Sequence, residues 1–158
     1  MEPIIAFQHP DDSPAKGAPR LRVHAPRSSI NRKILLVEDD PAFREIMRDF
    51  LTESGFSVVA VQNGVQGVHE VLASDFKIVL CDMMMPALPG DMFYCAVERL
   101  RPQLCERFIF MTGHRSNPRL SEFIEKVRGS ILTKPFRLDD LLEMIAFVEM
   151  RSSLRLAA

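Results

Sequence analysis

The chain has 158 residues, a formal net charge of −1 and a hydrophobic fraction of 47%. This length suits one domain with a genuine core, and the charge gives no electrostatic support for direct contact with nucleic acid or a membrane surface. The three cysteines, Cys81, Cys95 and Cys105, contain no CxxC pair, which suits a reducing compartment, so we expect a cytoplasmic protein without a membrane span.

The first part of the chain differs from the rest in composition. Residues 1–32 hold five of the eleven prolines, and their apolar residues show no sustained period. Such a segment cannot bury enough surface to offset the entropy lost on ordering. We therefore expect a disordered extension or linker at 1–32, a domain at 33–151 and a short tail at 152–158.

The domain begins with an apolar run at residues 34–37 that is typical of a buried strand. Asp40 stands just before Pro41, and this pair predicts a helix with an aspartate cap and proline at its first position. Apolar residues at spacings of three and four continue the helix until Ser54 and Gly55, a typical C-terminal signal.

The same alternation of strand and helix then repeats. Because strands alternate with helical patterns, we predict an α/β fold with a parallel sheet, helices on both faces and right-handed crossovers. Further strands are expected at 56–61, 77–82, 108–111 and 131–133, and further helices at 65–72, 92–100, 116–127 and from 138 onward.

One strand ends on an isolated carboxylate. The run of residues 77–81, which is apolar from Ile78 onward, leads directly into Asp82. A role as a simple turn former is the alternative for this residue taken alone. In open α/β sheets, however, ligands bind at the carboxyl ends of the strands. The other strands end on residues suited to the same site: Glu38 and Asp39, Thr112, and Lys134.

The charges at this edge require compensation. Three carboxylates in one place repel one another, and burying them unpaired is costly. Lys134 supplies one positive charge, and Mg²⁺, which prefers oxygen ligands, is the natural second. With both in place, Asp82 is predicted to act as a nucleophile toward a phosphoryl group, with Thr112 as a hydroxyl donor. An aspartyl phosphate would then pull on Thr112 and its loop.

Four motifs together carry a family resemblance. They are residues 36–40, Asp82 with Pro86 and Gly90 four and eight positions later, residues 111–113, and residues 134–136. Over about residues 33–151 the chain resembles the receiver domain of two-component response regulators. The resemblance implies a doubly wound, flavodoxin-like sheet of five parallel strands in the order 2-1-3-4-5.

The resemblance also implies a function. Asp82 would be phosphorylated by a histidine kinase or phosphotransfer protein, and the change would switch a downstream protein partner or a second copy of the chain. Mg²⁺ (or Mn²⁺) would be held by Asp39 directly, by Glu38 through water, by Asp82 and by the Met84 carbonyl. Such a domain is a Mg-dependent phosphoacceptor with slow self-dephosphorylation rather than a dedicated enzyme.

Two features depart from the family pattern. Ile131 stands where the family usually has tyrosine or phenylalanine, which leaves the usual coupling of site to surface open. The segment 127–130 is short, as in receivers attached to hybrid histidine kinases, so a domain cut from such a kinase is one interpretation. Met84 and His114 match positions where the family tunes the lifetime of the phosphoryl group.

Three other classes are less consistent with the motifs. A haloacid-dehalogenase-type phosphatase needs a DxD nucleophile after the first strand, and residues 38–41 do not provide it. A flavodoxin-type FMN binder needs a glycine- and hydroxyl-rich loop where this chain has three acids. The remaining alternative is a pseudo-receiver that is not phosphorylated and acts only as a protein-interaction module.

Overall fold

The computed structural model describes residues 32–113 and 118–156. Its parallel strands form one sheet in the order β2-β1-β3-β4-β5, which confirms the predicted fold. His114, the predicted helix start at 116–117 and nearly all of the extension predicted at 1–32 lie outside the described residues. The elements are β1 (Lys33–Val37), α1 (Pro41–Glu53), β2 (Ser57–Val61), α2 (Gly64–Ala73), β3 (Ile78–Asp82), α3 (Gly90–Leu100), the 3-10 helix η1 (Pro102–Arg107), β4 (Phe108–Thr112), α4 (Pro118–Lys126), β5 (Ser130–Thr133) and α5 (Leu138–Leu156).

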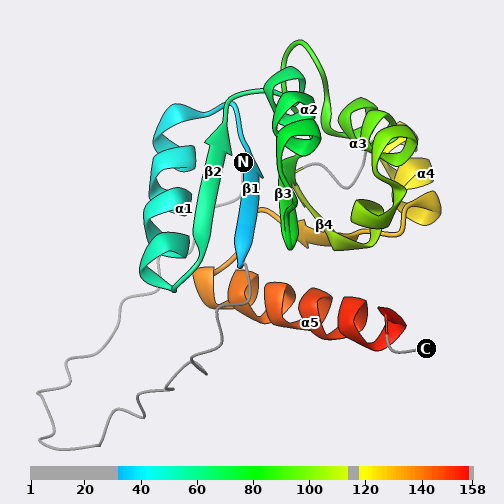
Figure 1. Ribbon diagram of the computed structural model, residues 1–158. Helices are drawn as coiled ribbons and strands as arrows, with labels where there is room; N and C mark the ends of the chain where they lie inside the picture. The colour runs from blue at the N-terminus through cyan, green and yellow to red at the C-terminus, as the bar shows by residue number, and fades with distance from the viewer. Residues whose placement is uncertain (1–31, 114–117, 157–158) are drawn as a thin grey trace, which may run out of the picture.

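Helices cover both faces of the sheet (Figure 1). Successive side chains of a strand point to opposite faces, so Ile34 and Leu36 pack on one side and Leu35 on the other. The first side is covered by α1 and α5, which contribute buried residues such as Met47 and Ile145. The second side is covered by α2, α3 and α4. The strands are therefore held between two apolar layers.

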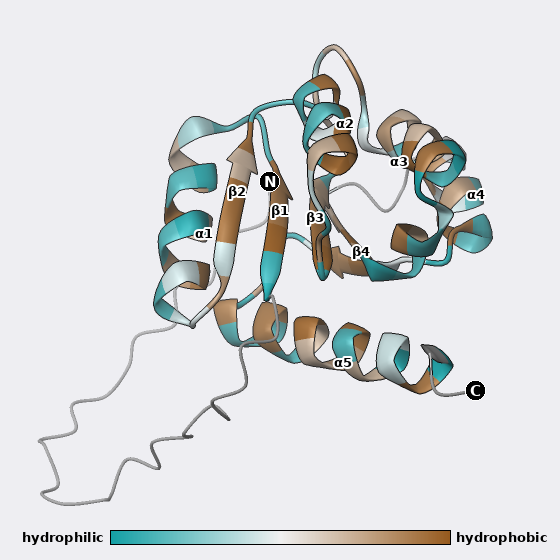
Figure 2. Cartoon of the chain, in the orientation of Figure 1, coloured by the Kyte–Doolittle hydropathy of each residue, from teal (hydrophilic) through white to brown (hydrophobic). Residues whose placement is uncertain are grey.

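The central strands are hydrophobic along most of their length, as the brown colour of β1 and β3 shows in Figure 2. Every residue of β3 and β4 is buried, as expected for parallel strands covered on both faces. The edge strand β2 is more exposed and begins with a solvent-facing Ser57. No helix in the described ranges is both long and apolar enough to cross a membrane.

The predicted helix signals have their expected geometry. The Asp40 side chain accepts hydrogen bonds from the backbone N–H groups of Ala42, at 2.9 Å, and Phe43, at 3.0 Å. These bonds satisfy donors that have no partner inside α1. Gly55 follows the helix with φ of +90°, a left-handed conformation that glycine adopts without steric cost.

Some boundaries differ from the sequence-based prediction. β2 begins at Ser57 rather than at residue 56, because the Phe56 N–H donates to the Leu51 carbonyl and so completes the C-terminal cap of α1. The 3-10 helix η1 was not predicted; its short turn buries Leu104 and Cys105. Helix α5 continues into the segment 152–158 that we expected as a tail.

A close approach between α2 and α3 depends on Gly67. A Cβ atom at this position would lie 2.9 Å from ring carbons of Phe93 and 3.3 Å from a methyl group of Val37. Phe93 is fully buried, so its ring cannot move into solvent. Contact between the two helices therefore requires a residue without a side chain here.

We expect Gly67→Ala to lower the free energy of unfolding by about 1–3 kcal/mol through overpacking. The opposing gain in helix propensity is only about 1 kcal/mol. Urea unfolding of the wild type and the variant measures the difference. In a Phe93→Leu background, which removes the ring, the same substitution should cost much less. An equal cost in both backgrounds would contradict the packing explanation.

Candidate functional site

The carboxyl edge of the sheet gathers three acidic residues. Glu38, Asp39 and Asp82 each offer a carboxylate oxygen, and these oxygens lie within 4.8 Å of one another. Glu38 and Asp39 follow β1, while Asp82 is the last residue of the neighbouring β3. Glu38 is 1% exposed and Asp82 is 6% exposed, so two of the three carboxylates are withdrawn from solvent.

Lys134 brings a positive charge to the same place from the end of β5. Its Nζ atom lies 3.2 Å from Oε2 of Glu38 and 3.5 Å from Oδ1 of Asp82. The Lys134 N–H donates to the Thr112 carbonyl at 2.7 Å, which continues the pairing of β4 and β5 and fixes where the side chain starts. One ammonium group is thus shared between two carboxylates.

Burial makes these carboxylates harder to ionise. The pKa of Glu38 is raised, first by desolvation and then by the nearby charge of Asp82, while Lys134 opposes the shift. The pKa of Asp82 is also raised by desolvation, and Lys134 again acts in the opposite direction. The site is therefore short of positive charge even with Lys134 in place.

The other predicted site residues lie at the same edge. Thr112 ends β4, is fully buried, and directly follows Met111, the register partner of Asp82. The Met84 N–H lies 3.4 Å from Oδ1 of Asp82, while the Met84 side chain is 55% exposed. The structure therefore brings together the residues that the strand ends indicated, and Met84 faces Asp82 with its backbone.

A glycine holds the loop after β3 close to Asp82. A Cβ atom at Gly90 would lie 2.7 Å from the Asp82 carbonyl oxygen and 2.9 Å from the Met83 Cα atom. The Gly90 N–H also donates to the Met83 carbonyl at 3.2 Å. The first residue of α3 therefore packs against the backbone that carries the carboxylate, which restricts where the loop can lie.

Several contacts at this edge were not predicted. The Lys134 ammonium lies 4.7 Å from the centre of the Phe43 ring, and this ring meets Phe136 edge-on at 6.2 Å. Arg44 donates to the backbone carbonyls of Glu38, at 2.7 Å, and Asp39, at 3.3 Å. The sequence could have indicated these contacts only through the position of Phe43 and Arg44, which lie in the first turn of α1, directly beyond the Asp40 cap.

The donor set fits a hard divalent cation. Carboxylate oxygens are the ligands that Mg²⁺ prefers, and a second positive charge would relieve the deficit left by Lys134. Cys81, one residue before Asp82, packs in the hydrophobic core and does not belong to the cluster of carboxylate oxygens, and burial raises the pKa of its thiol well above the ordinary value.

Comparison with curated proteins finds relatives among bacterial regulatory and sensor proteins. The transcriptional activator protein IrlR of Burkholderia pseudomallei is 32% identical over 123 residues, which are 78% of this chain and 50% of IrlR. The sensor protein GacS of Pseudomonas syringae is 28% identical over 137 residues, 83% of this chain and 15% of GacS. The chain thus spans half of the first relative and a small part of the second.

A solved structure and a family model lead to the same group of proteins. The response regulator protein TrrA of Thermotoga maritima, solved in complex with Mg²⁺ and BeF, superimposes with a TM-score of 0.65 at 22% identity, covering 74% of this chain and 98% of TrrA. At that identity the likeness concerns the fold. The family model of the response regulator receiver domain matches residues 34–146. The chain therefore belongs to the response regulator receiver domain family.

Proposed function

We propose that this receiver domain accepts a phosphoryl group on Asp82 from a histidine kinase or a phosphotransfer protein, in a reaction that depends on Mg²⁺. The observation that carries the proposal is the Lys134 ammonium, 3.5 Å from Asp82 and 3.2 Å from Glu38 within the acidic cluster. An anionic phosphoryl group can approach three acids only where positive charge is already present.

The residues divide the chemistry among them. Glu38, Asp39, Asp82 and the Met84 carbonyl would hold Mg²⁺, which supplies positive charge toward the phosphoryl oxygens when bound. A carboxylate oxygen of Asp82 attacks phosphorus, and the bond from phosphorus to the donor's histidine nitrogen breaks. Lys134 pairs with a second phosphoryl oxygen. Because Lys134 already contacts Asp82, it needs little rearrangement to do so.

The new phosphoryl group is proposed to change the surface through Thr112. Its hydroxyl is drawn toward the phosphoryl oxygens, and the end of β4 shifts with it. Ile131, at the position where the resemblance leads one to expect an aromatic ring, is half-buried opposite Phe110 in the neighbouring strand. Aromatic contacts on this face come instead from Phe110, which packs edge-on against Phe123 of α4 at 5.3 Å.

Acetyl phosphate with Mg²⁺ should add one phosphoryl group to the wild-type protein, as measured by intact mass. Asp82→Asn should abolish the adduct, because the amide is not a nucleophile. Asp91→Asn is the matched control, since Asp91 stands at the start of α3, beyond the loop. A wild type that never gains the adduct, or an Asp82→Asn variant that still does, would favour the pseudo-receiver alternative.

Mg²⁺ alone should raise the unfolding temperature of the wild type, because an ion that binds only the folded state stabilises it by about 2.7 kcal/mol at a hundred times its Kd. Asp39→Asn and Glu38→Gln should lose most of this rise. The control is Asp49→Asn, which removes an exposed carboxylate paired with Arg48 on α1. If the control and the two site variants respond alike, the ion does not bind at the acidic cluster.

Lys134→Met should destabilise the protein by about 1–3 kcal/mol near neutral pH in the absence of Mg²⁺, because it leaves buried carboxylates without their counter-charge. The Lys134 side chain is 29% exposed, so the cost stays below that of losing one partner of a fully buried ion pair. The pKa of Asp82 and that of Glu38 should rise further, so the loss grows as pH rises through those values and shrinks in acid. Urea unfolding at about pH 5 and about pH 7 tests this. Lys126→Met, at the end of α4, is the control; a pH-independent loss would contradict the electrostatic account.

A further inference from the structure

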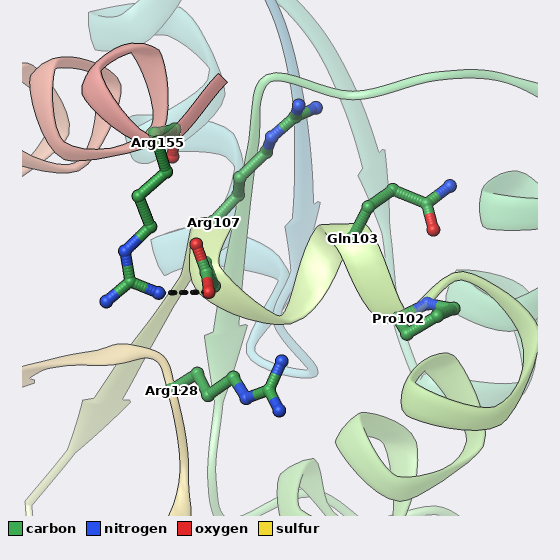
Figure 3. Close-up of a pocket in the computed structure, with 7 residues that line it drawn as sticks. Pro102, Gln103, Arg107, Arg128 and Arg155 are labelled. Carbon is green, nitrogen blue, oxygen red and sulfur yellow. Dashed lines mark hydrogen bonds and ion pairs between the residues drawn. The ribbon is translucent and has the colours of Figure 1, made fainter. Parts of the chain in front are cut away.

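A second cluster of charge lies at the opposite edge of the sheet, next to the amino ends of β4 and β5. Arg107 of η1, Arg128 of the segment between α4 and β5, and Arg155 of α5 line one cavity of about 300 Å³ (Figure 3). Glu106 and Ser152 line it as well. Three arginines thus line the cavity together with a single carboxylate, so the cavity has an excess of positive charge, although only the Arg155 guanidinium meets that carboxylate in Figure 3.

Much of the hydrogen-bonding capacity of these arginines is unused. Arg155 forms an ion pair with Glu106, marked by the dashed line in Figure 3. Arg107 donates to the Phe76 carbonyl at 3.0 Å. The Arg128 guanidinium has no hydrogen bond or ion pair within residues 32–113 and 118–156. Each guanidinium carries five N–H donors, so several remain available to an anion.

Hydrogen bonds between side chains and backbone groups hold the walls of the cavity together. Nη2 of Arg151 donates to the Glu106 carbonyl at 2.6 Å and to the Arg128 carbonyl at 3.2 Å. The Arg128 N–H in turn donates to the Tyr94 hydroxyl of α3 at 3.3 Å. The elements that carry the arginines are therefore held in place before any ligand arrives, which lowers the entropic cost of binding.

Ser152 lines the cavity, but its hydroxyl oxygen is not open to it. Its hydroxyl oxygen is inaccessible to solvent and has no hydrogen-bond partner in the described part of the chain. A buried polar group without a partner costs free energy, commonly about 1–3 kcal/mol. Because solvent does not reach this oxygen, a ligand in the cavity meets Ser152 through its other atoms, and the positive charge of the arginines carries the binding.

We propose that this cavity binds the phosphate group of a small phosphorylated ligand. A phosphate accepts hydrogen bonds from several directions, which matches donors arriving from three separate elements, whereas a carboxylate is planar and is satisfied by one guanidinium fork. The cavity volume of about 300 Å³ stands at the lower end of small-molecule sites, which favours a compact ligand over a peptide chain. The site is separate from Asp82 and does not depend on phosphorylation there.

The test is an NMR titration of the full chain in Mg²⁺-free buffer, with inorganic phosphate and glycerol phosphate as separate arms. Sodium chloride at matched ionic strength and a glutamate-rich peptide are the comparison arms. Either phosphate should shift the side-chain Nε–H signals of Arg107, Arg128 and Arg155 and the Ser152 amide signal in a saturable manner. Arg128→Gln should weaken this binding at least about tenfold.

Two further variants separate binding from folding. Ser152→Ala should unfold at the same temperature as the wild type or higher, since it removes an unpartnered hydroxyl, and should bind phosphate like the wild type, since that hydroxyl is closed off from the cavity. Arg48→Gln removes an exposed arginine paired with Glu45 on α1 and should bind phosphate like the wild type. Equal shifts with chloride, unchanged affinity in Arg128→Gln, or tighter binding of the glutamate-rich peptide would each overturn the proposal.

Discussion

The ammonium group shared between Glu38 and Asp82 is the interaction on which the rest of the site depends. Both carboxylates are nearly inaccessible to solvent, and each would be costly to ionise without Lys134. Lys134 follows β5, two strands away from β3, so the contact exists only when the sheet has its full order. The charge of the buried acids is therefore balanced only when the strands have this order. A strand pairing that displaced β5 would leave the acids uncompensated.

The packing around the sheet also fixes the position of the residues at its carboxyl edge. β1 and β3 are buried on both faces, and the acids appear at the point where their apolar runs stop. Gly90 packs against the backbone of Asp82 and Met83, so the loop after β3 has little freedom to move away. Arg44 binds two carbonyls just after β1 and ties the start of α1 to the acidic turn. The positions of the functional groups are thus set by backbone contacts.

Local signals in the sequence predicted much of this arrangement. Asp40 before Pro41 marked the start of α1, the alternation of strands and helices predicted a parallel sheet, and the family resemblance implied the strand order that is observed. The strand ends pointed to the acids and to Lys134 because parallel strands end at a common edge. The 3-10 helix η1 was missed because it depends on tertiary burial of Leu104 and Cys105 rather than on a periodic pattern. Phe43 beneath Lys134 was missed for the same reason, since its partner is distant in the chain.

The arginine cavity could not have been predicted in this way. Arg107, Arg128 and Arg155 are separated widely in sequence, and each has the appearance of an ordinary solvated charge. Only the packing of η1, the segment before β5 and α5 brings them together. The domain therefore has acidic groups at the carboxyl edge of its sheet and an excess of arginines at the amino edge of β4 and β5. This separation makes binding at the two edges independently testable.

We propose that Lys134 and the acids at the carboxyl edge form one site for a phosphoryl group on Asp82. The most direct test is a crystal structure of the protein with Mg²⁺ and beryllofluoride, which mimics a phosphoryl group. We expect beryllium bonded to the Asp82 carboxylate, a fluoride within hydrogen-bonding distance of the Lys134 ammonium, and Mg²⁺ held by Asp39, Asp82 and the Met84 carbonyl, with Glu38 reaching the ion through water. Beryllofluoride absent from Asp82 under saturating conditions, or Lys134 turned away from a bound adduct, would contradict it.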